Sequence, residues 1–499
     1  ARDLKAIVLR KLGQPKEAAA LLRSTRALDS LDWWARHLLG EALGCDLQTA
    51  LDLALDCARA GLYTEAIGLL REAENTAIRP REKVAKANGH APAPLPDQSW
   101  GAAPLVHYYL GWLHEKLGDA KAAIAAYQTA AVLPPDYCFP ARLEEIGILE
   151  AAMRLNPRDG RAPYYLGNLL YDRRRHEEGI RLWERAARLD PRFSIVWRNL
   201  GIGYFNIRQE PVKARLAYDR AFKVNPADAR LLYERDQLWK RLGESPAKRL
   251  GQLEQHPELV RQRDDLSVEL CALCTQVGRP QEALQLVSSR HFQPWEGGEG
   301  GPLGQHVRAH LALGREALAQ GAATQAREHF GAAMRAPANL GEAKHLLANQ
   351  SDIHYWLGCA CEALGEKQAA LAHWQAAATF KGDFQEMSVR SFSEMTYFSA
   401  LSWMRLGRKS TGRNLLKDLL VYAEKLAKAP AKIDYFATSL PTMLLFDDDL
   451  QVRQQTNAWF LQAQAHLGLG NQAKARKLLK AVLQRDPNHA LAADHLSEL

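Results

Sequence analysis

The chain has 499 residues, of which 47% are hydrophobic and 24% charged, and its formal net charge is +8. This length is too great for one compact core, so it indicates several domains or an array of repeats that pack only on their neighbours. Basic residues alternate with acids and form no continuous stripe with aromatics, which argues against a nucleic-acid surface. No stretch approaches eighteen uninterrupted apolar residues, so we expect no membrane insertion.

Residues 1–86 predict helical pairs, and a proline-rich segment follows them. Gly13 and Gly61 mark turns between helices, and each is followed five residues later by an alanine suited to a helix crossing. Residues 87–104 include Pro92, Pro94 and Pro96, which cannot continue a helix. We interpret 87–104 as a linker or surface loop.

A stronger repeat occupies residues 105–290. One copy contains Leu166-Gly167 in a first helix, Trp183 and Ala186 in a second helix, and Pro191 at its end. The small residues lie where two helices cross, and the proline ends the second helix. This is the pattern of the tetratricopeptide repeat (TPR), a unit of about 34 residues. The sequence therefore predicts an all-α fold, a TPR right-handed superhelical solenoid of ten to twelve antiparallel helix pairs. In this fold, Gly167 and Gly201 are expected to lie against a neighbouring helix of their own pair.

The segment 291–305 interrupts the array with glycines and glutamates around a tryptophan. Trp295, Glu296, Gly297, Gly298 and Glu299 form a candidate ligand-binding loop. A tryptophan face and carboxylates suit a sugar, whereas phosphate cradles present bare N–H groups and a lysine. The alternative is a structural turn in which Trp295 plugs the solenoid.

Residues 306–499 predict a C-terminal TPR array with a non-TPR insertion at about 429–450. The insertion carries a candidate acidic patch, formed by Asp434, Tyr435, Asp447, Asp448 and Asp449. The aspartates lack the alternating ligands and closing glutamate of a calcium loop. They suit the N-terminus of a helix that starts near Leu450, and a partner-binding patch is the alternative. We expect Trp295 to lie in or beside a pocket near this insertion.

Signatures of catalysis, metal binding and cofactors are missing from the sequence, which contains no H-E-x-x-H, G-x-S-x-G or G-x-x-x-x-G-K-[ST] motif. Cys271 and Cys274 form a C-x-x-C without a second pair, which favours reduced structural thiols and a cytoplasmic location. His354 and His373 have no histidine partner at i+4, so we expect ordinary packing. We predict no catalytic residues, no metal site and no cofactor.

Several phrases of the sequence resemble a family of large bacterial TPR proteins. They are the segments 292–300, 339–344, 434–436 and 446–450, with 165–171, 197–201 and 263–266 upstream. Gln293 stands where the family phrase has histidine. The resemblance implies an N-terminal β-sandwich region of unknown function, similar to carbohydrate-active β-sandwiches, before the TPR region. The chain begins without methionine and inside a helical pattern, so we expect it to be the C-terminal part of such a protein.

These observations predict a protein-interaction scaffold that holds a protein or peptide on its concave face. The alternative is the helical part of a carbohydrate-active enzyme, in which Trp295, Glu296 and Glu299 contribute to a sugar site. In either case we expect that the chain alone turns over no substrate.

Overall fold

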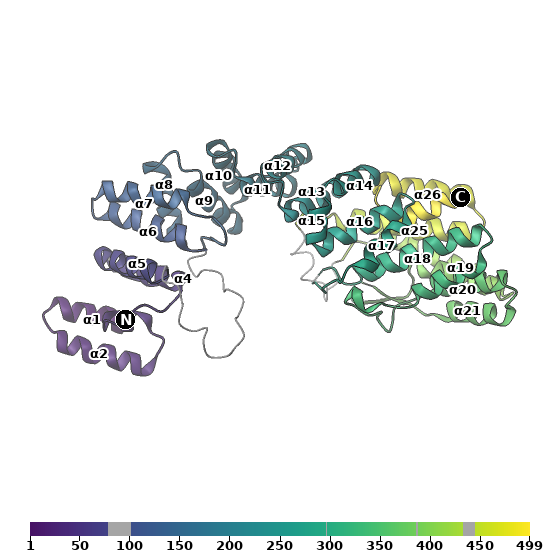
Figure 1. Ribbon diagram of the computed structural model, residues 1–499, viewed down its shortest axis with the longest axis horizontal. Helices are drawn as coiled ribbons and strands as arrows, with labels where there is room; N and C mark the ends of the chain where they lie inside the picture. Colours follow the sequence, from purple (N-terminus) through teal and green to yellow (C-terminus); the bar gives the residue numbers. More distant parts are fainter. Residues whose placement is uncertain (78–100, 296, 386–387, 433–444) are drawn as a thin grey trace. The chain divides into compact units, whose positions relative to one another are not determined.

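The computed structural model of the protein describes residues 1–77, 101–295, 297–385, 388–432 and 445–499 (Figure 1). They divide into two compact units, Ala1–Arg208 (unit 1) and Gln209–Leu499 (unit 2). The predicted all-α TPR fold is confirmed, because both units consist of stacked helix pairs. The boundary between the units lies inside the array expected at 105–290. The loop expected at 87–104 is outside the described residues up to residue 100, and a helix begins at Ala103.

Unit 1 contains eleven helices among its described residues. They are α1 (Arg2–Lys11), α2 (Pro15–Leu28), α3 (Trp33–Leu38), α4 (Leu47–Arg59), α5 (Tyr63–Ala77), α6 (Ala103–Lys116), α7 (Ala120–Val132), α8 (Glu144–Leu155), α9 (Arg161–Asp172), α10 (His176–Leu189) and α11 (Ser194–Asn206). Tight turns join the paired helices. Gly118 takes a left-handed conformation between α6 and α7, with φ of 80°, and Arg174 takes one between α9 and α10, with φ of 61°. Glycine adopts this conformation without strain, whereas arginine does so at a cost.

Unit 2 is also built of helix pairs and adds a short hairpin. Its helices are α12 (Pro211–Val224), α13 (Ala229–Arg241), α14 (Pro246–Glu254), α15 (Pro257–Gln262), α16 (Asp264–Gln276), α17 (Pro280–Ser289), α18 (Gly301–Ala319), α19 (Ala323–Ala333), the 3₁₀ turn η1 (Ala338–Leu340), α20 (Ser351–Ala363), α21 (Lys367–Thr379), α22 (Met395–Arg405), α23 (Lys409–Lys428), α25 (Leu450–Gly468), α26 (Gln472–Arg485) and α27 (Ala490–Ser497). The strands β1 (Asp383–Gln385) and β2 (Ser388–Arg390) pair antiparallel, with Asp383 opposite Arg390. The sequence pattern did not predict this hairpin.

A glycine in the first helix packs against an aromatic ring in the second helix of the same pair. Four pairs repeat this contact with the two residues sixteen positions apart: Gly111 with Tyr127, Gly167 with Trp183, Gly314 with Phe330, and Gly358 with Trp374. A Cβ atom on Gly167 would lie 2.5 Å from the indole of Trp183, which no real side chain tolerates. The predicted position of Gly167 is therefore confirmed, and the glycine sets how closely the two helices approach. The expected position of Gly201 stays a prediction.

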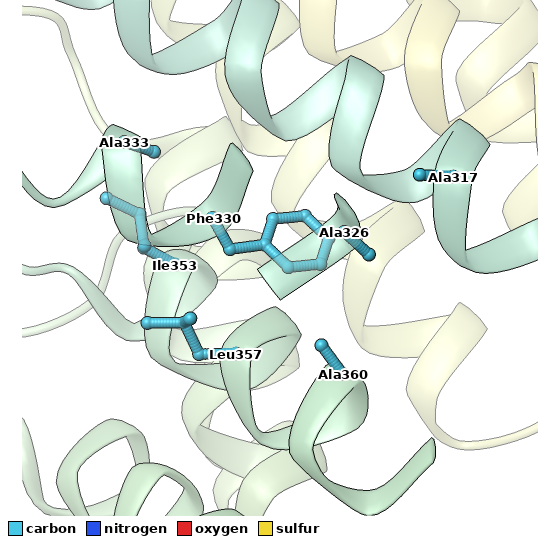
Figure 2. Close-up of a cluster of buried hydrophobic side chains, with 7 residues drawn as sticks. All are labelled: Ala317, Ala326, Phe330, Ala333, Ile353, Leu357 and Ala360. Atoms are coloured by element: carbon cyan, nitrogen blue, oxygen red, sulfur yellow. The ribbon is translucent and has the colours of Figure 1, made fainter. Parts of the chain in front are cut away.

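The same aromatic ring also joins one repeat to the next. Figure 2 shows Phe330 of α19 between Ala317 of α18 and the side chains of Ile353 and Leu357 on α20. Phe330 is fully buried in this cluster. Each repeat buries apolar surface only by stacking on its neighbours, so the core is a continuous seam along the array.

The alternation of helix pairs is interrupted in unit 1 before α9. The segment 133–143 has no regular secondary structure, and the single helix α8 follows it. The fully buried carboxylate of Glu145 accepts hydrogen bonds from the backbone N–H groups of Ala141 (2.6 Å) and Arg142 (2.8 Å) and from the Tyr109 hydroxyl (3.0 Å). A buried carboxylate needs such partners, and here they hold the irregular segment against α6.

Unit 2 closes on itself, because its last repeat contacts its first helices. Asn488 Nδ2 donates to the Glu244 carbonyl at 3.2 Å, and Gln276 Nε2 donates to the Pro487 carbonyl at 3.1 Å. Pro487 and Asn488 lie between α26 and α27, and α27 itself contacts α16. The residues joined here are more than 200 positions apart in the chain.

A buried arginine organises this closure. Arg249, 1% exposed, donates to Asp236 (2.9 and 2.5 Å), to Glu269 (2.9 Å) and to the Asn488 side-chain oxygen (2.8 Å). Burial alone would raise the pKa of Glu269, but Lys240 and Arg249 hold that pKa well below its ordinary value. The charges compensate one another inside the unit, so removal of one member leaves an unpaired buried charge.

The close contact between Gly167 and Trp183 predicts how a substitution of the glycine changes stability. We expect Gly167→Ala to destabilise unit 1 by about 1–3 kcal/mol, because the new methyl group overlaps the Trp183 ring. Gly147 on α8 is the matched control, since it is exposed and a Cβ atom there meets nothing within 4 Å. Gly147→Ala should leave stability unchanged or raise it by up to about 1 kcal/mol. Thermal and urea unfolding of both variants would measure this, and equal stability of the two variants would refute the proposed crossing.

Candidate functional site

The tryptophan of the glycine-rich loop packs on the loop itself. Trp295 is half-buried, and its ring covers Gly298 so closely that a Cβ atom at that position would overlap the indole. Its ring edge also approaches Gly301, which packs on Val268 of α16. Glu296 lies outside the described residues. These contacts place the ring against its own loop and near the start of α18, and the choice between a ligand-binding loop and a plug of the solenoid stays a prediction.

The carboxylates next to this tryptophan bind backbone N–H groups. Glu299 is exposed and accepts from the Gly297 N–H at 2.9 Å. Glu342, from a distant part of the chain, accepts from the N–H groups of Gly300 (2.6 Å) and Leu303 (2.8 Å) at the start of α18. A carboxylate at this position satisfies donors that have no partner within the helix and interacts favourably with the helix dipole.

The structure brings together two of the phrases that carry the family resemblance, 292–300 and 339–344. The backbone N–H of Phe292 donates to the Asn339 carbonyl at 2.8 Å, and Asn339 Nδ2 donates to the carbonyl of Arg290 at 2.7 Å. Gly341 lies against the Phe292 carbonyl, where a Cβ atom would come within 2.5 Å of the oxygen. Residues of one phrase therefore contact residues of the other phrase. The spacing along the sequence did not predict these contacts.

The described acidic residues of the insertion have different surroundings. Asp434 and Tyr435 lie outside the described residues. The prediction of a helix cap is confirmed, because α25 begins at Leu450 and Asp449 accepts from the Val452 N–H at 3.0 Å. Asp448 pairs with Arg241 on α13 at 2.6 Å, and Asp447 is exposed.

The expected pocket shared by Trp295 and the insertion stays a prediction, because Glu296 and residues 433–444 lie outside the described residues. Beside the acidic residues, Phe446 is buried with its ring 5.6 Å from that of Tyr218 on α12. The described partners of the insertion lie on α12, α13 and α25, whereas those of Trp295 lie in its own loop and at the start of α18.

The helix-capping role of Glu342 can be tested. Glu342→Ala should lower the free energy of unfolding by about 1–2 kcal/mol, because two N–H groups at the start of α18 lose their acceptor. Glu299→Ala is the control, since that carboxylate is exposed and bonds one loop amide. If Glu299→Ala destabilises unit 2 as much as Glu342→Ala, this assignment of structural roles is incorrect.

Two histidine pairs lie in successive repeats of unit 2. His310 and His329, on α18 and α19, place their Nδ1 atoms 3.0 Å apart. His354 and His373, on α20 and α21, place theirs 3.1 Å apart. Each distance requires one ring to donate its N–H and the other to accept, so the accepting ring of each pair is neutral. The sequence analysis missed these partners because it considered i+4 spacing, although the nineteen-residue separation common to both pairs was a usable signal.

The surroundings of these histidines oppose their protonation. Burial lowers the pKa of His310 to about 4, and His306, His329 and Arg335 add to the effect. Burial likewise lowers the pKa of His354, assisted by His373 and Lys344. Protonation of both rings of a pair would place two imidazolium cations in direct contact between the helices of one repeat.

Stability should therefore fall in mild acid. The folded-state pKa of His310 lies below its ordinary value of 6.5, so the unfolded chain binds the proton first. The stability that depends on a neutral His310 ring is fully present above pH 6.5 and is lost as the pH falls toward 4. The loss in the free energy of unfolding amounts to about 3 kcal/mol for this residue. Urea unfolding across this range should show a shallower pH dependence for His310→Phe than for wild type. The exposed His291, changed to Phe, is the control, and an unchanged slope in His310→Phe would contradict the assignment.

The cysteines have structural positions. Cys271 and Cys274 are buried in α16, and burial raises the pKa of Cys271 to about 12 and that of Cys274 to about 11. Thiols with such pKa values are unreactive at neutral pH. Among the residues that the structure describes, no group of three or more histidine, cysteine and acidic side chains could hold a metal ion. None of the described helices has the length and apolar character of a membrane span.

A polar cluster on the first helices of unit 1 is a second candidate site. Asn199 Nδ2 on α11 donates to Asn168 Oδ1 on α9 at 3.0 Å, and Trp183 Nε1 donates to the same oxygen at 3.0 Å. Both asparagines are half-buried, and Arg198 lies beside them with Nη1 3.5 Å from Asn199 Oδ1. Amide and guanidinium groups donate to the carbonyl and carboxylate oxygens that a peptide offers. The sequence analysis named these residues only as parts of repeat phrases.

Comparison with known proteins agrees with this architecture. Tetratricopeptide repeat models match residues 106–137 and 146–202 in unit 1 and residues 456–489 in unit 2. The chain therefore carries tetratricopeptide repeats in both units. Proteins built from such repeats are interaction modules, so the class of this protein is a helical scaffold for protein–protein contact.

Individual similar proteins match only part of this chain. It is 26% identical to the BBSome complex member bbs-4 of Caenorhabditis elegans over 137 residues, which is 25% of this chain and 29% of that protein. Among solved structures, it is similar to YrrB, a TPR protein with an unusual peptide-binding site, at 16% identity over 46% of this chain and 97% of that one, with a TM-score of 0.29. A TPR protein from Parabacteroides merdae matches at 14% identity over 63% and 98%, with a TM-score of 0.25.

Proposed function

We propose that the protein is a scaffold that binds a segment of a partner protein across the first helices α9 and α11 of unit 1. The observation that carries this proposal is the hydrogen bond between Asn168 and Asn199, which connects polar side chains of two successive first helices. Successive first helices form a continuous face in a TPR array, so a ligand can contact several repeats at once.

The cluster is prepared for a ligand. The Trp183 N–H and the Asn199 amide both donate to Asn168, which restricts the rotamers of both asparagines. Side chains that are ordered before binding lose little conformational entropy when a ligand arrives. Arg198 adds a positive charge at the edge of the cluster, so the partner segment should offer carboxylates or backbone carbonyls.

The glycine-rich loop supports an interaction scaffold over the sugar-site alternative. Trp295 covers Gly298, and the carboxylates of Glu299 and Glu342 accept hydrogen bonds from backbone N–H groups of the loop and of α18. A sugar would compete with these internal partners for the same groups. The assignment of function therefore rests on the helical faces.

The proposal predicts a charge-specific loss of binding. Partners of the full chain would be identified by affinity capture and mass spectrometry, and the bound segment would be measured by titration calorimetry. Arg198→Glu should weaken that segment at least tenfold, which corresponds to about 1.4 kcal/mol. Arg181→Glu, an exposed change of the same charge on the second helix α10, is the matched control. Equal affinity of wild type and both variants would exclude α11 as the docking face.

A further inference from the structure

The C-terminal helix α27 contacts helices far outside its own repeat. On one side, Ala492 packs with Phe460 and Leu479 of the last repeat. On its other side, Asp494 pairs with Arg308 at 3.1 Å, and the same carboxylate lies 3.8 Å from Arg315. Both arginines are on α18, about 180 positions earlier in the chain.

Further contacts extend the same surface. Glu498 pairs with Arg315 at 3.0 Å. The His495 ring lies 5.4 Å from that of Tyr397 on α22 and 5.7 Å from that of Phe460 on α25. Arg308 also donates to the Ala272 carbonyl of α16 at 3.2 Å. Apart from α26 of its own repeat, the partners of α27 thus lie on α16, α18, α22 and α25, which are the first helices of their pairs.

The chemistry of this contact is that of a ligand in a groove. Asp494 and Glu498 are four positions apart and therefore share one face of α27. Arg308 and Arg315 are seven positions apart, two turns along one face of α18. Arg308 and Asp494 are largely buried, with side chains 12% and 17% exposed, so their attraction is only weakly screened. An amphipathic helix in a groove of complementary charge is a common mode of peptide recognition.

We infer that the first-helix face of unit 2 is a second binding groove, specific for a helix that presents two carboxylates one turn apart, and that α27 is its built-in occupant. With α27 in place the groove is blocked. An external acidic helix must displace an intramolecular competitor whose effective concentration is in the millimolar range, so binding requires prior opening of α27. This groove is separate from the Asn168 and Asn199 cluster and does not depend on the function proposed for unit 1.

The length of α27 is compatible with such opening. Helices shorter than about twelve residues are marginal without packing, and α27 has 8 residues. Its helical structure therefore depends on the contacts described above. Segments of this kind open locally before the surrounding repeats unfold.

The test uses a fluorescently labelled peptide with the sequence of residues 486–499 and the full-length chain. The double variant Asp494→Ala, Glu498→Ala should bind the peptide at least tenfold more tightly than wild type, because its own α27 no longer pairs with α18. Asp418→Ala, Glu424→Ala, two exposed acids on α23, removes the same charge and should behave like wild type. Adding Arg308→Glu and Arg315→Glu to the first variant should abolish binding.

Two results would overturn the inference. One is peptide binding that is equal in wild type and the double variant, or that persists after reversal of both arginines. The other comes from hydrogen exchange of the unmodified chain, which needs no variant to fold. The amides of α27 should exchange faster than those of α25 and α26, and equal protection of all three helices would mean that α27 opens only when the last repeat unfolds. Neither result would affect the Arg198→Glu test in unit 1.

Discussion

The contact between a first-helix glycine and a second-helix aromatic ring is the constraint on which the rest of this structure depends. Gly167 and Trp183 illustrate it, since the indole occupies the space where any side chain would lie. The close approach fixes the two helices of a pair, and the same ring then reaches the next repeat, as Phe330 does toward Ile353 and Leu357. A larger residue at the crossing would separate the pair and disturb both interfaces.

A second constraint acts over a much longer distance. Arg249 and its partners Asp236, Glu269 and Asn488 join the first and last parts of unit 2 through a buried polar network. A buried ion pair contributes little net stability compared with apolar packing, but breaking it is costly. The network therefore determines which parts of unit 2 meet, and it adds little to the free energy of unfolding. Closure also brings α27 against α18, which gives unit 2 its occupied groove.

The interruptions of the array have mainly structural roles, and the polar faces of the helices are the better candidates for function. Glu342 caps α18, Asp449 caps α25, and Glu145 holds the segment before α8. In contrast, Asn168, Asn199 and Arg198 place hydrogen-bond donors on successive first helices. In a scaffold, recognition is distributed over such faces, because each repeat offers only a small surface.

The sequence by itself determined the repeat and its register, because small residues, aromatics and prolines recur at positions set by local helix geometry. For the same reason it identified the cap at Asp449, which depends on neighbouring residues only. Tertiary structure alone decided that Glu342 reaches the glycine-rich loop, that Asn488 returns to Arg249, and that α27 lies against Arg308. These contacts depend on the rotation between successive repeats, which accumulates along the stack and leaves no periodic pattern in the chain. The nineteen-residue separation of the histidine pairs is regular along the sequence. It indicates a contact between the side chains only once it is known which helices pair.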